Sequence, residues 1–136
     1  MLTLLPLLAA AVACAASSSA TPDAAPDAAP QPQALLQQIH ELIGTPACTA
    51  SSECKSLAVG AKACGGPDYY LPWSNVHTAP AELADAAERY RQARRAQVIA
   101  RHEMSTCNIT ADPGAYCKAG QCVLRRPSLS GPADAT

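Results

Sequence analysis

The sequence of 136 residues has no Phe, and its aromatic side chains are four Tyr and one Trp. Much of its 49% hydrophobic content is Ala, which buries little apolar surface. The segment that can form a domain, residues 45–127, has roughly 80 residues, a size at which apolar burial alone seldom holds a fold. The absence of large apolar side chains therefore predicts a fold that needs covalent cross-links.

Motifs for catalysis or metal binding are also missing. The pair Gly65-Gly66 lacks the G-K-[ST] that completes a phosphate loop, and no G-x-S-x-G is present. The three histidines, His40, His77 and His102, lie far apart and in no ligand spacing. We therefore expect no catalytic residue, no metal site and no cofactor, and we keep a hydrolase only as a remote alternative.

Strong charge of one sign is absent, since the formal net charge is −1. All ten Lys and Arg lie within residues 45–127, against seven acidic residues in the same span. This mild basicity falls short of a nucleic-acid-binding composition, so we expect no nucleic-acid partner.

An export signal is predicted over residues 1–13. The apolar run from Leu2 to Ala13 is too short for a helix that spans about 30 Å of bilayer. It leads into Ala-Ala-Val-Ala-Cys14, which resembles the lipobox of bacterial lipoproteins, with Ala11 where that pattern usually has Leu. Cleavage by an ordinary signal peptidase after Ala13 or Ala20 is the alternative.

The number of cysteines favours lipidation of Cys14, because seven is odd and a thioether on Cys14 leaves six that can pair. We therefore expect a membrane partner through a lipid on Cys14. Residues 14–32 are rich in Ser, Ala, Pro and Asp and predict a disordered linker. Residues 128–136 predict a disordered tail.

Two helices are predicted from apolar spacing. Residues 33–44 form a short amphipathic helix that ends at Gly44. Residues 79–104 form a long helix with Pro80 in its first turn, acidic residues early, arginines later and an Asp85–Arg89 pair. Its predicted apolar stripe consists of Leu83, Ala86, Ala87, Tyr90, Ala93 and Ile99.

Three short strands complete a predicted α+β fold, at 54–60, 114–118 and 121–125, in one antiparallel sheet. The last two strands form a hairpin with a turn at Ala119-Gly120, which places Cys117 opposite Cys122.

The six cysteines of the domain are Cys48, Cys54, Cys64, Cys107, Cys117 and Cys122, and fifteen pairings are possible. We expect Cys64 to pair with Cys107, which fastens the segment Ala63-Cys64-Gly65-Gly66-Pro67 to the end of the long helix. Local bonds within the two remaining pairs are geometrically allowed. Bonds between those pairs close loops of more than 60 residues, worth over about 4 kcal/mol each, against about 2 kcal/mol for local bonds. A domain with so small a core needs the larger effect, so we predict the long-range bonds.

Two surfaces are candidates for binding. The segment containing Tyr69, Tyr70 and Trp73 is predicted to be a loop that serves either as a lid on the core, which we favour, or as a contact platform. Arg91 and Arg95 lie on the long helix and form either a solvated face, which we favour, or a contact for anionic headgroups or an acidic partner.

The span from Cys48 to Cys122 combines C-x5-C, A-C-G-G-P, a long charged helix before Met-Ser-Thr-Cys107, and C-x4-C. It resembles a small cysteine-containing domain of uncharacterised bacterial envelope lipoproteins and secreted proteins. The resemblance implies export and disulfides but no activity. We therefore expect a non-catalytic binding or structural domain anchored in the cell envelope, at the outer membrane or in the periplasm, with a possible protein partner there. The alternative is a secreted inhibitor-like module that inserts residues 69–73 into a partner's cleft.

Overall fold

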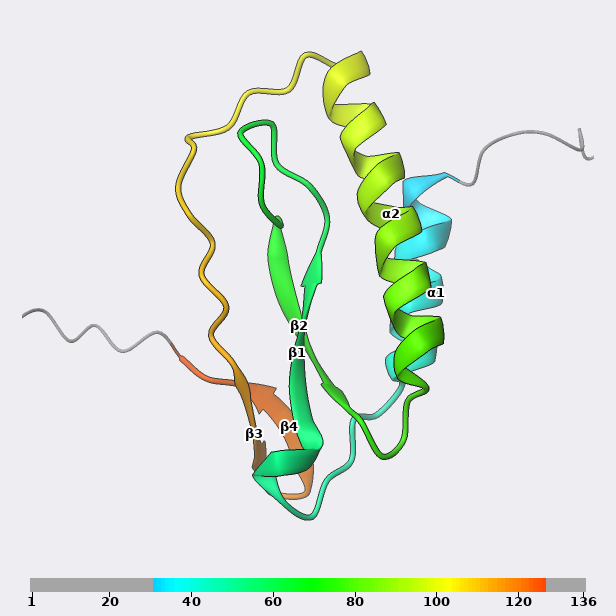
Figure 1. Ribbon diagram of the computed structural model, residues 1–136, viewed down its shortest axis with the longest axis vertical. Coiled ribbons are helices and arrows are strands. Elements are labelled where there is room, and N and C mark those ends of the chain that lie inside the picture. The colour runs from blue at the N-terminus through cyan, green and yellow to red at the C-terminus, as the bar shows by residue number, and fades with distance from the viewer. Residues whose placement is uncertain (1–30, 127–136) are drawn as a thin grey trace, which may run out of the picture.

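The computed structural model describes residues 31–126 and confirms the α+β class (Figure 1). Cys14, the predicted export signal, the tail and nearly all of the linker lie outside the described residues. The elements in chain order are α1 (Pro32–Ile43), the 3-10 turn η1 (Ser51–Glu53), β1 (Cys54–Val59), β2 (Tyr69–Ser74), α2 (Pro80–Ala100), β3 (Ala115–Lys118) and β4 (Gln121–Leu124).

The two helices lie side by side and run in opposite directions (Figure 1). In α1, Leu35, Ile39 and Ile43 are buried at a spacing of four residues, which is the apolar face that the sequence predicts. Pro32 occupies the first turn, where its missing N–H costs no hydrogen bond. Gly44 follows the helix with a φ of 52° and donates its N–H to the carbonyl of His40.

Helix α2 buries Leu83, Ala86, Ala87 and Tyr90, as predicted, together with Val98. The expectation that Ile99 is also buried is wrong, because 65% of its surface is exposed. With 3.6 residues per turn, positions 83, 87, 90, 94 and 98 lie on one face of the helix, and position 99 lies beside that face.

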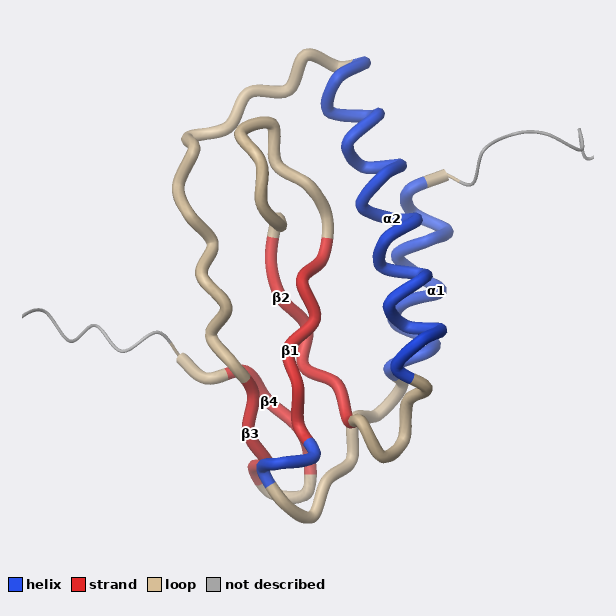
Figure 2. The backbone as a smooth tube through the Cα atoms, in the orientation of Figure 1, coloured by secondary structure: helices blue, strands red, loops and turns tan. Residues whose placement is uncertain are grey.

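The long helix ends at Ala100, four residues before the predicted end. His102 has a φ of 51°, and the N–H groups of His102 and Glu103 bond to the carbonyls of Ile99 and Val98. These two bonds form a Schellman motif, which terminates a helix. Residues 101–114, here called the arm, then run without regular structure down to the hairpin (Figure 2).

Within residues 31–126 the strands form two sheets of two strands each, so the predicted single sheet of three strands is wrong. Strand β1 pairs with β2 from Cys54↔Ser74 to Val59↔Tyr69, and residues 69–73 therefore form a strand rather than the predicted loop. Strands β3 and β4 form the predicted hairpin, with Cys117 opposite Cys122. The return from β1 to β2 is made by residues 60–68, here called the knot.

The β1–β2 sheet lies between the helices on one side and the hairpin and arm on the other (Figure 2). Alternate side chains of β1 reach opposite sides. Leu57 and Val59 pack with the helices in the larger core cluster, whereas Cys54 packs with Cys48 and Cys122 in a second cluster. The molecule therefore has an apolar core on the helix side and a core of disulfides on the hairpin side.

Candidate functional site

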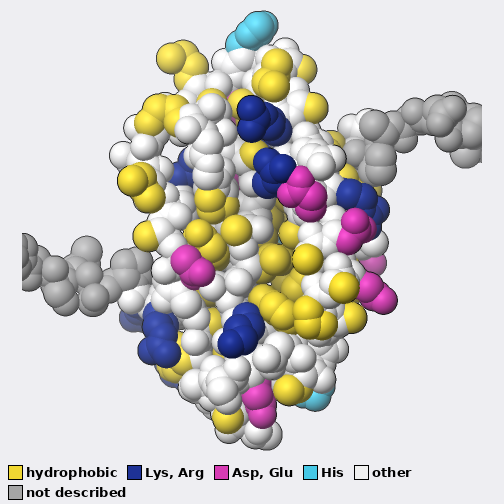
Figure 3. Space-filling model, viewed as in Figure 1, with side chains coloured by type: hydrophobic (Ala, Val, Ile, Leu, Met, Phe, Trp, Pro, Cys, Tyr) yellow, Lys and Arg dark blue, Asp and Glu magenta, His cyan; other side chains and the backbone are white. Residues whose placement is uncertain are grey.

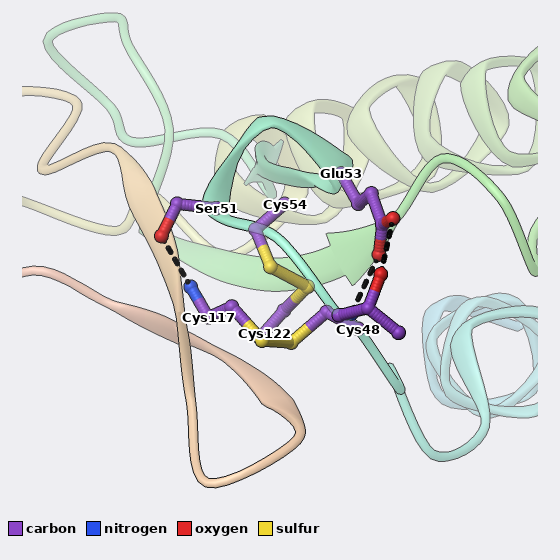
Figure 4. Close-up of a disulfide and its surroundings, with 7 residues drawn as sticks. Cys48, Ser51, Glu53, Cys54, Cys117 and Cys122 are labelled. Carbon is purple, nitrogen blue, oxygen red and sulfur yellow. Dashed lines mark hydrogen bonds between the residues drawn. A yellow bond between two sulfur atoms is a disulfide. The ribbon is translucent and has the colours of Figure 1, made fainter.

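Two disulfides, Cys48–Cys117 and Cys54–Cys122, lie at the hairpin, here called the closed end of the molecule. Their Cα atoms are 5.9 Å and 5.3 Å apart, and the bonds span 69 and 68 residues, so the predicted long-range linkage is confirmed. Because Cys117 and Cys122 face each other across the hairpin, the two bonds lie next to each other (Figure 4).

Hydrogen bonds hold the segment that carries Cys48 and Cys54. The Glu53 carboxylate accepts from the N–H of Thr49 at 2.7 Å and from its hydroxyl at 2.8 Å, and the N–H of Cys117 donates to Ser51 Oγ at 3.1 Å (Figure 4). The backbone N–H of Thr49 is the main cause of a lowered pKa at Glu53. These contacts of residues 49–53 are not among the features predicted from the sequence.

The sulfur atoms of Cys48, Cys54 and Cys122 lie within 4.8 Å of one another. Such a cluster suggests a metal site when the cysteines are thiols, since the thiolate is the metal ligand. Here each of these sulfurs belongs to a disulfide, and the two adjacent bonds account for the cluster.

The third disulfide joins Cys64 of the knot to Cys107 of the arm, with Cα atoms 5.3 Å apart, as predicted. It lies at the opposite end of the molecule, here called the open end, and both of its cysteines are exposed. Because α2 ends at Ala100, the bond fastens the knot to the arm rather than to the helix itself.

The knot is built around Asp68. The Asp68 carboxylate accepts from the N–H of Ala61 at 3.0 Å, and it leaves no room for a Cβ at Gly60, whose φ is 83°. Lys62 donates its backbone N–H to Gly66 and its Nζ to the carbonyl of Asn108 at 2.7 Å. The conformation of the knot therefore depends on glycine at position 60 and on contacts with the arm.

Arg94 connects the knot, α2 and the arm. Its guanidinium lies 2.7 Å from Glu103 of the arm and 3.5 Å from Asp68 of the knot. The hydrogen bond from Arg94 lowers the pKa of Glu103. The sequence analysis does not single out Arg94, although its position four residues after Tyr90 on the buried stripe is the signal that identifies it.

Arg91 and Arg95 line a hollow of about 410 Å³ between the knot and the last turns of α2. Its apolar lining includes Ala58, Pro67 and Val98. In the space-filling view, basic side chains lie over the upper half of α2 beside hydrophobic ones (Figure 3). The predicted arginine surface thus lies against the knot, whereas the predicted Cys64–Cys107 bond placed the knot only at the end of the long helix.

The aromatic candidates lie apart from this hollow, since Tyr69, Tyr70 and Trp73 do not line it. Trp73 is half-buried and packs against the helix-side core, and 36% of Tyr69 is exposed. Burial raises the pKa of Tyr69. Of these three rings, Trp73 is the one that packs in the helix-side cluster of the described residues, so the lid remains a prediction for Tyr69 and Tyr70.

The predicted Asp85–Arg89 pair is present, with 2.9 Å between Nε and the carboxylate. Arg91 forms a second pair with Glu88 at 2.6 Å, and its hydrogen bonds lower the pKa of Glu88 to about 2. Within residues 31–126, Arg95 forms neither an ion pair nor a side-chain hydrogen bond.

Neither described helix has the combination of length and apolar character needed to cross a membrane. Comparison of the chain with protein families, with curated proteins and with solved structures found no match.

Proposed function

We propose that the chain is exported and serves as a non-catalytic binding or structural domain, held at the bacterial envelope by a lipid on Cys14. The observation that carries this proposal is the complete pairing of the other six cysteines. Multiple disulfides are typical of exported proteins, and their pairing leaves Cys14 as the seventh cysteine, after an apolar run.

The contacts of the described residues support a role in binding or structure rather than catalysis. The six cysteines of the domain are in disulfides and offer no thiolate nucleophile. His40, His77 and His102 are exposed, and within residues 31–126 their side chains form no hydrogen bond with one another. The hollow beside the knot gives the domain a concave surface for a ligand.

The inhibitor alternative depends on a protruding aromatic loop. Residues 69–73 instead belong to β2 and pair with β1 along its length. This segment is thus a paired strand and not the loop that the inhibitor alternative names, so we place that alternative second.

The experiment is expression of the full chain in a bacterium, followed by membrane fractionation and mass spectrometry of the mature N-terminus. We expect the chain in the membrane fraction, with Cys14 as its first residue and an added acyl mass. The matched control is Cys14→Ser, which we expect to leave the membrane fraction. A mature chain that begins at Ala15 or later without an acyl group would refute the anchor.

Titration of the denatured, unreduced mature chain with a thiol reagent tests the proposal that the domain is not a cysteine enzyme. We expect no free thiol from the six cysteines of the domain. A stoichiometric reactive thiol would contradict the pairing and would restore a cysteine enzyme as a candidate.

A further inference from the structure

The hollow beside the knot has two guanidinium groups in its wall and no carboxylate among its lining residues. Arg91 forms an ion pair with Glu88, which is not among the lining residues. Arg95 has no partner within the described residues. The hollow therefore carries positive charge that contacts within residues 31–126 do not fully balance.

A second hollow, of about 290 Å³, provides an internal comparison. It shares Lys62, Ala63 and Val98 with the first hollow, but its other charged side chains are Asp68, Arg94 and Glu103. Arg94 already pairs with Glu103 at 2.7 Å and with Asp68 at 3.5 Å, and Lys62 supplies the second positive charge. The second hollow is therefore a balanced structural network, and the unbalanced charge belongs to the first.

The wall opposite the arginines is made of the knot. Ala63, Cys64 and Gly66 are exposed residues, and within residues 31–126 their backbone N–H groups have no hydrogen-bond partner in the protein. Such amides can donate to an oxyanion, as guanidinium groups do. Apart from Lys62, the rest of the lining is apolar and includes Ala58, Pro67 and Ile99, and 65% of Ile99 is exposed.

We propose that this hollow binds a small organic anion, with a carboxylate or phosphate group on Arg95 and Arg91 and an apolar body against Pro67, Val98 and Ile99. The volume of about 410 Å³ falls in the range of roughly 300–1,000 Å³ that is typical of small-molecule sites. Charge complementarity selects an anion, and the apolar lining selects an alkyl or aryl body over a free inorganic ion. This inference rests on the proposed binding function and names the class of ligand.

The test uses the full chain with Cys14→Ser, which has no lipid acceptor, and octyl phosphate below its micelle concentration as the probe in calorimetry. We expect saturable binding at one site, and no binding of the neutral analogue 1-octanol. Arg95→Gln should weaken binding roughly tenfold or more, because one charge-assisted contact is lost. Arg91→Gln should weaken it less, because Arg91 is already engaged by Glu88.

The matched control is Arg89→Gln, on the same helix. Arg89 pairs with Asp85 and does not line the hollow, so binding should be unchanged while the net charge changes equally. Circular dichroism of each variant checks that the fold is kept. Equal losses in the Arg89 and Arg95 variants would show unspecific attraction and overturn the proposal, as would equal binding of octanol.

A second experiment distinguishes a soluble ligand from a lipid headgroup. Vesicles of phosphatidylglycerol and phosphatidylcholine are compared with phosphatidylcholine alone by flotation. Binding to anionic vesicles without binding of free octyl phosphate would overturn the proposal in favour of a membrane contact. Failure of the anchor would instead appear in the fractionation of the native chain, so the two proposals fail separately.

Discussion

The two ends of the molecule use disulfides in different ways. At the closed end, Cys54 and Cys122 are 5% and 2% exposed, and their bond lies beside Cys48–Cys117 in a small core of its own. At the open end, the single bond joins exposed segments beside two hollows. Disulfides thus replace apolar side chains at one end and fix the shape of a surface at the other.

The arrangement of the bonds along the chain sharpens this difference. Cys48–Cys117 and Cys54–Cys122 close nearly the same loop, of 69 and 68 residues. Once one of them is formed, the other closes only a path of about a dozen residues, which is worth about 3 kcal/mol instead of over 4 kcal/mol. The closed end is therefore partly redundant, whereas the open end has one bond over 43 residues.

The largest effect is expected when both bonds of the closed end are removed, by replacing Cys48, Cys54, Cys117 and Cys122 with Ala. In the chain-entropy model the loss is about 7 kcal/mol, which is comparable with the whole stability of a small domain. We expect thermal unfolding followed by circular dichroism to show no cooperative transition. The matched control, Cys54→Ala with Cys122→Ala, should lose about 3 kcal/mol and still unfold cooperatively. A similar loss in both variants would show that the two bonds are not redundant.

The second-largest effect is expected at the open end. We expect a mild dithiol reductant to open Cys64–Cys107 before the other bonds, because attack needs access to sulfur and both of these cysteines are exposed. Alkylation followed by peptide mapping measures the order of reduction. Cys64→Ala with Cys107→Ala should lose about 4 kcal/mol of stability, as the chain-entropy model gives for a loop of 43 residues. Hydrogen exchange should then rise in the knot and arm while β3 and β4 stay protected. Reduction of Cys54–Cys122 before Cys64–Cys107 would show that the disulfide of the closed end is the more accessible one, contrary to our expectation.

The cross-links were predictable because they depend on quantities that the sequence contains. Cysteine number, loop length and the size of the core indicate long-range bonds at the closed end, and the structure has them. The pairing of β1 was not predictable in the same way. Residues 67–73 contain two prolines, which favour a loop. Pro72 is tolerated opposite Ser56 because a sheet of two strands has only edge strands, where a missing N–H removes no essential bond.

The end of α2 was missed for a local reason. The position that adopts a positive φ after a helix is usually Gly, and here it is His102. No residue type therefore marks the end, and the predicted helix runs on to 104. The hollow was missed for a different reason. The predicted Cys64–Cys107 bond brings the knot towards the end of the long helix, but it does not indicate that the knot lies against Arg91 and Arg95.

A smaller effect is expected at Glu103, which ties the arm to Arg94 at the open end. Its pKa in the folded chain lies below the ordinary value of 4.5, so the contact stabilises the fold above that pH and is lost as pH falls through the lowered pKa. We expect Glu103→Gln to lower the melting temperature at pH 7 by a few degrees at most, because the pair is partly solvated.

The pH dependence separates this contact from a packing effect. The difference in melting temperature between the wild type and Glu103→Gln should shrink towards zero as pH falls below 4.5 and through the lowered pKa, because protonated Glu103 then resembles Gln. Glu82→Gln is the control: Glu82 is exposed on the first turn of α2 and forms no ion pair within residues 31–126. A difference for Glu103→Gln that stays constant with pH would contradict the ion pair.

The smallest effect concerns Ser74, which faces Cys54 across the sheet at the closed end and is fully buried. Within residues 31–126 its hydroxyl has no hydrogen-bond partner, and a buried hydroxyl without a partner destabilises the folded state. Ser74→Ala should therefore raise the free energy of unfolding, by about 0.5 to 1 kcal/mol in denaturant titration.

The matched variant is Ser56→Ala on β1. The Ser56 hydroxyl donates to Asp112 of the arm at 2.6 Å, so this variant should lower the free energy of unfolding by about 1 kcal/mol. Changes of opposite sign in the free energy of unfolding of the two variants would show that the closed end is held by disulfides despite an unpaired hydroxyl. They would also show that the arm is held by its polar contacts. A loss of stability in Ser74→Ala would mean that this hydroxyl has a partner, and the closed end would then depend on polar contacts as the arm does.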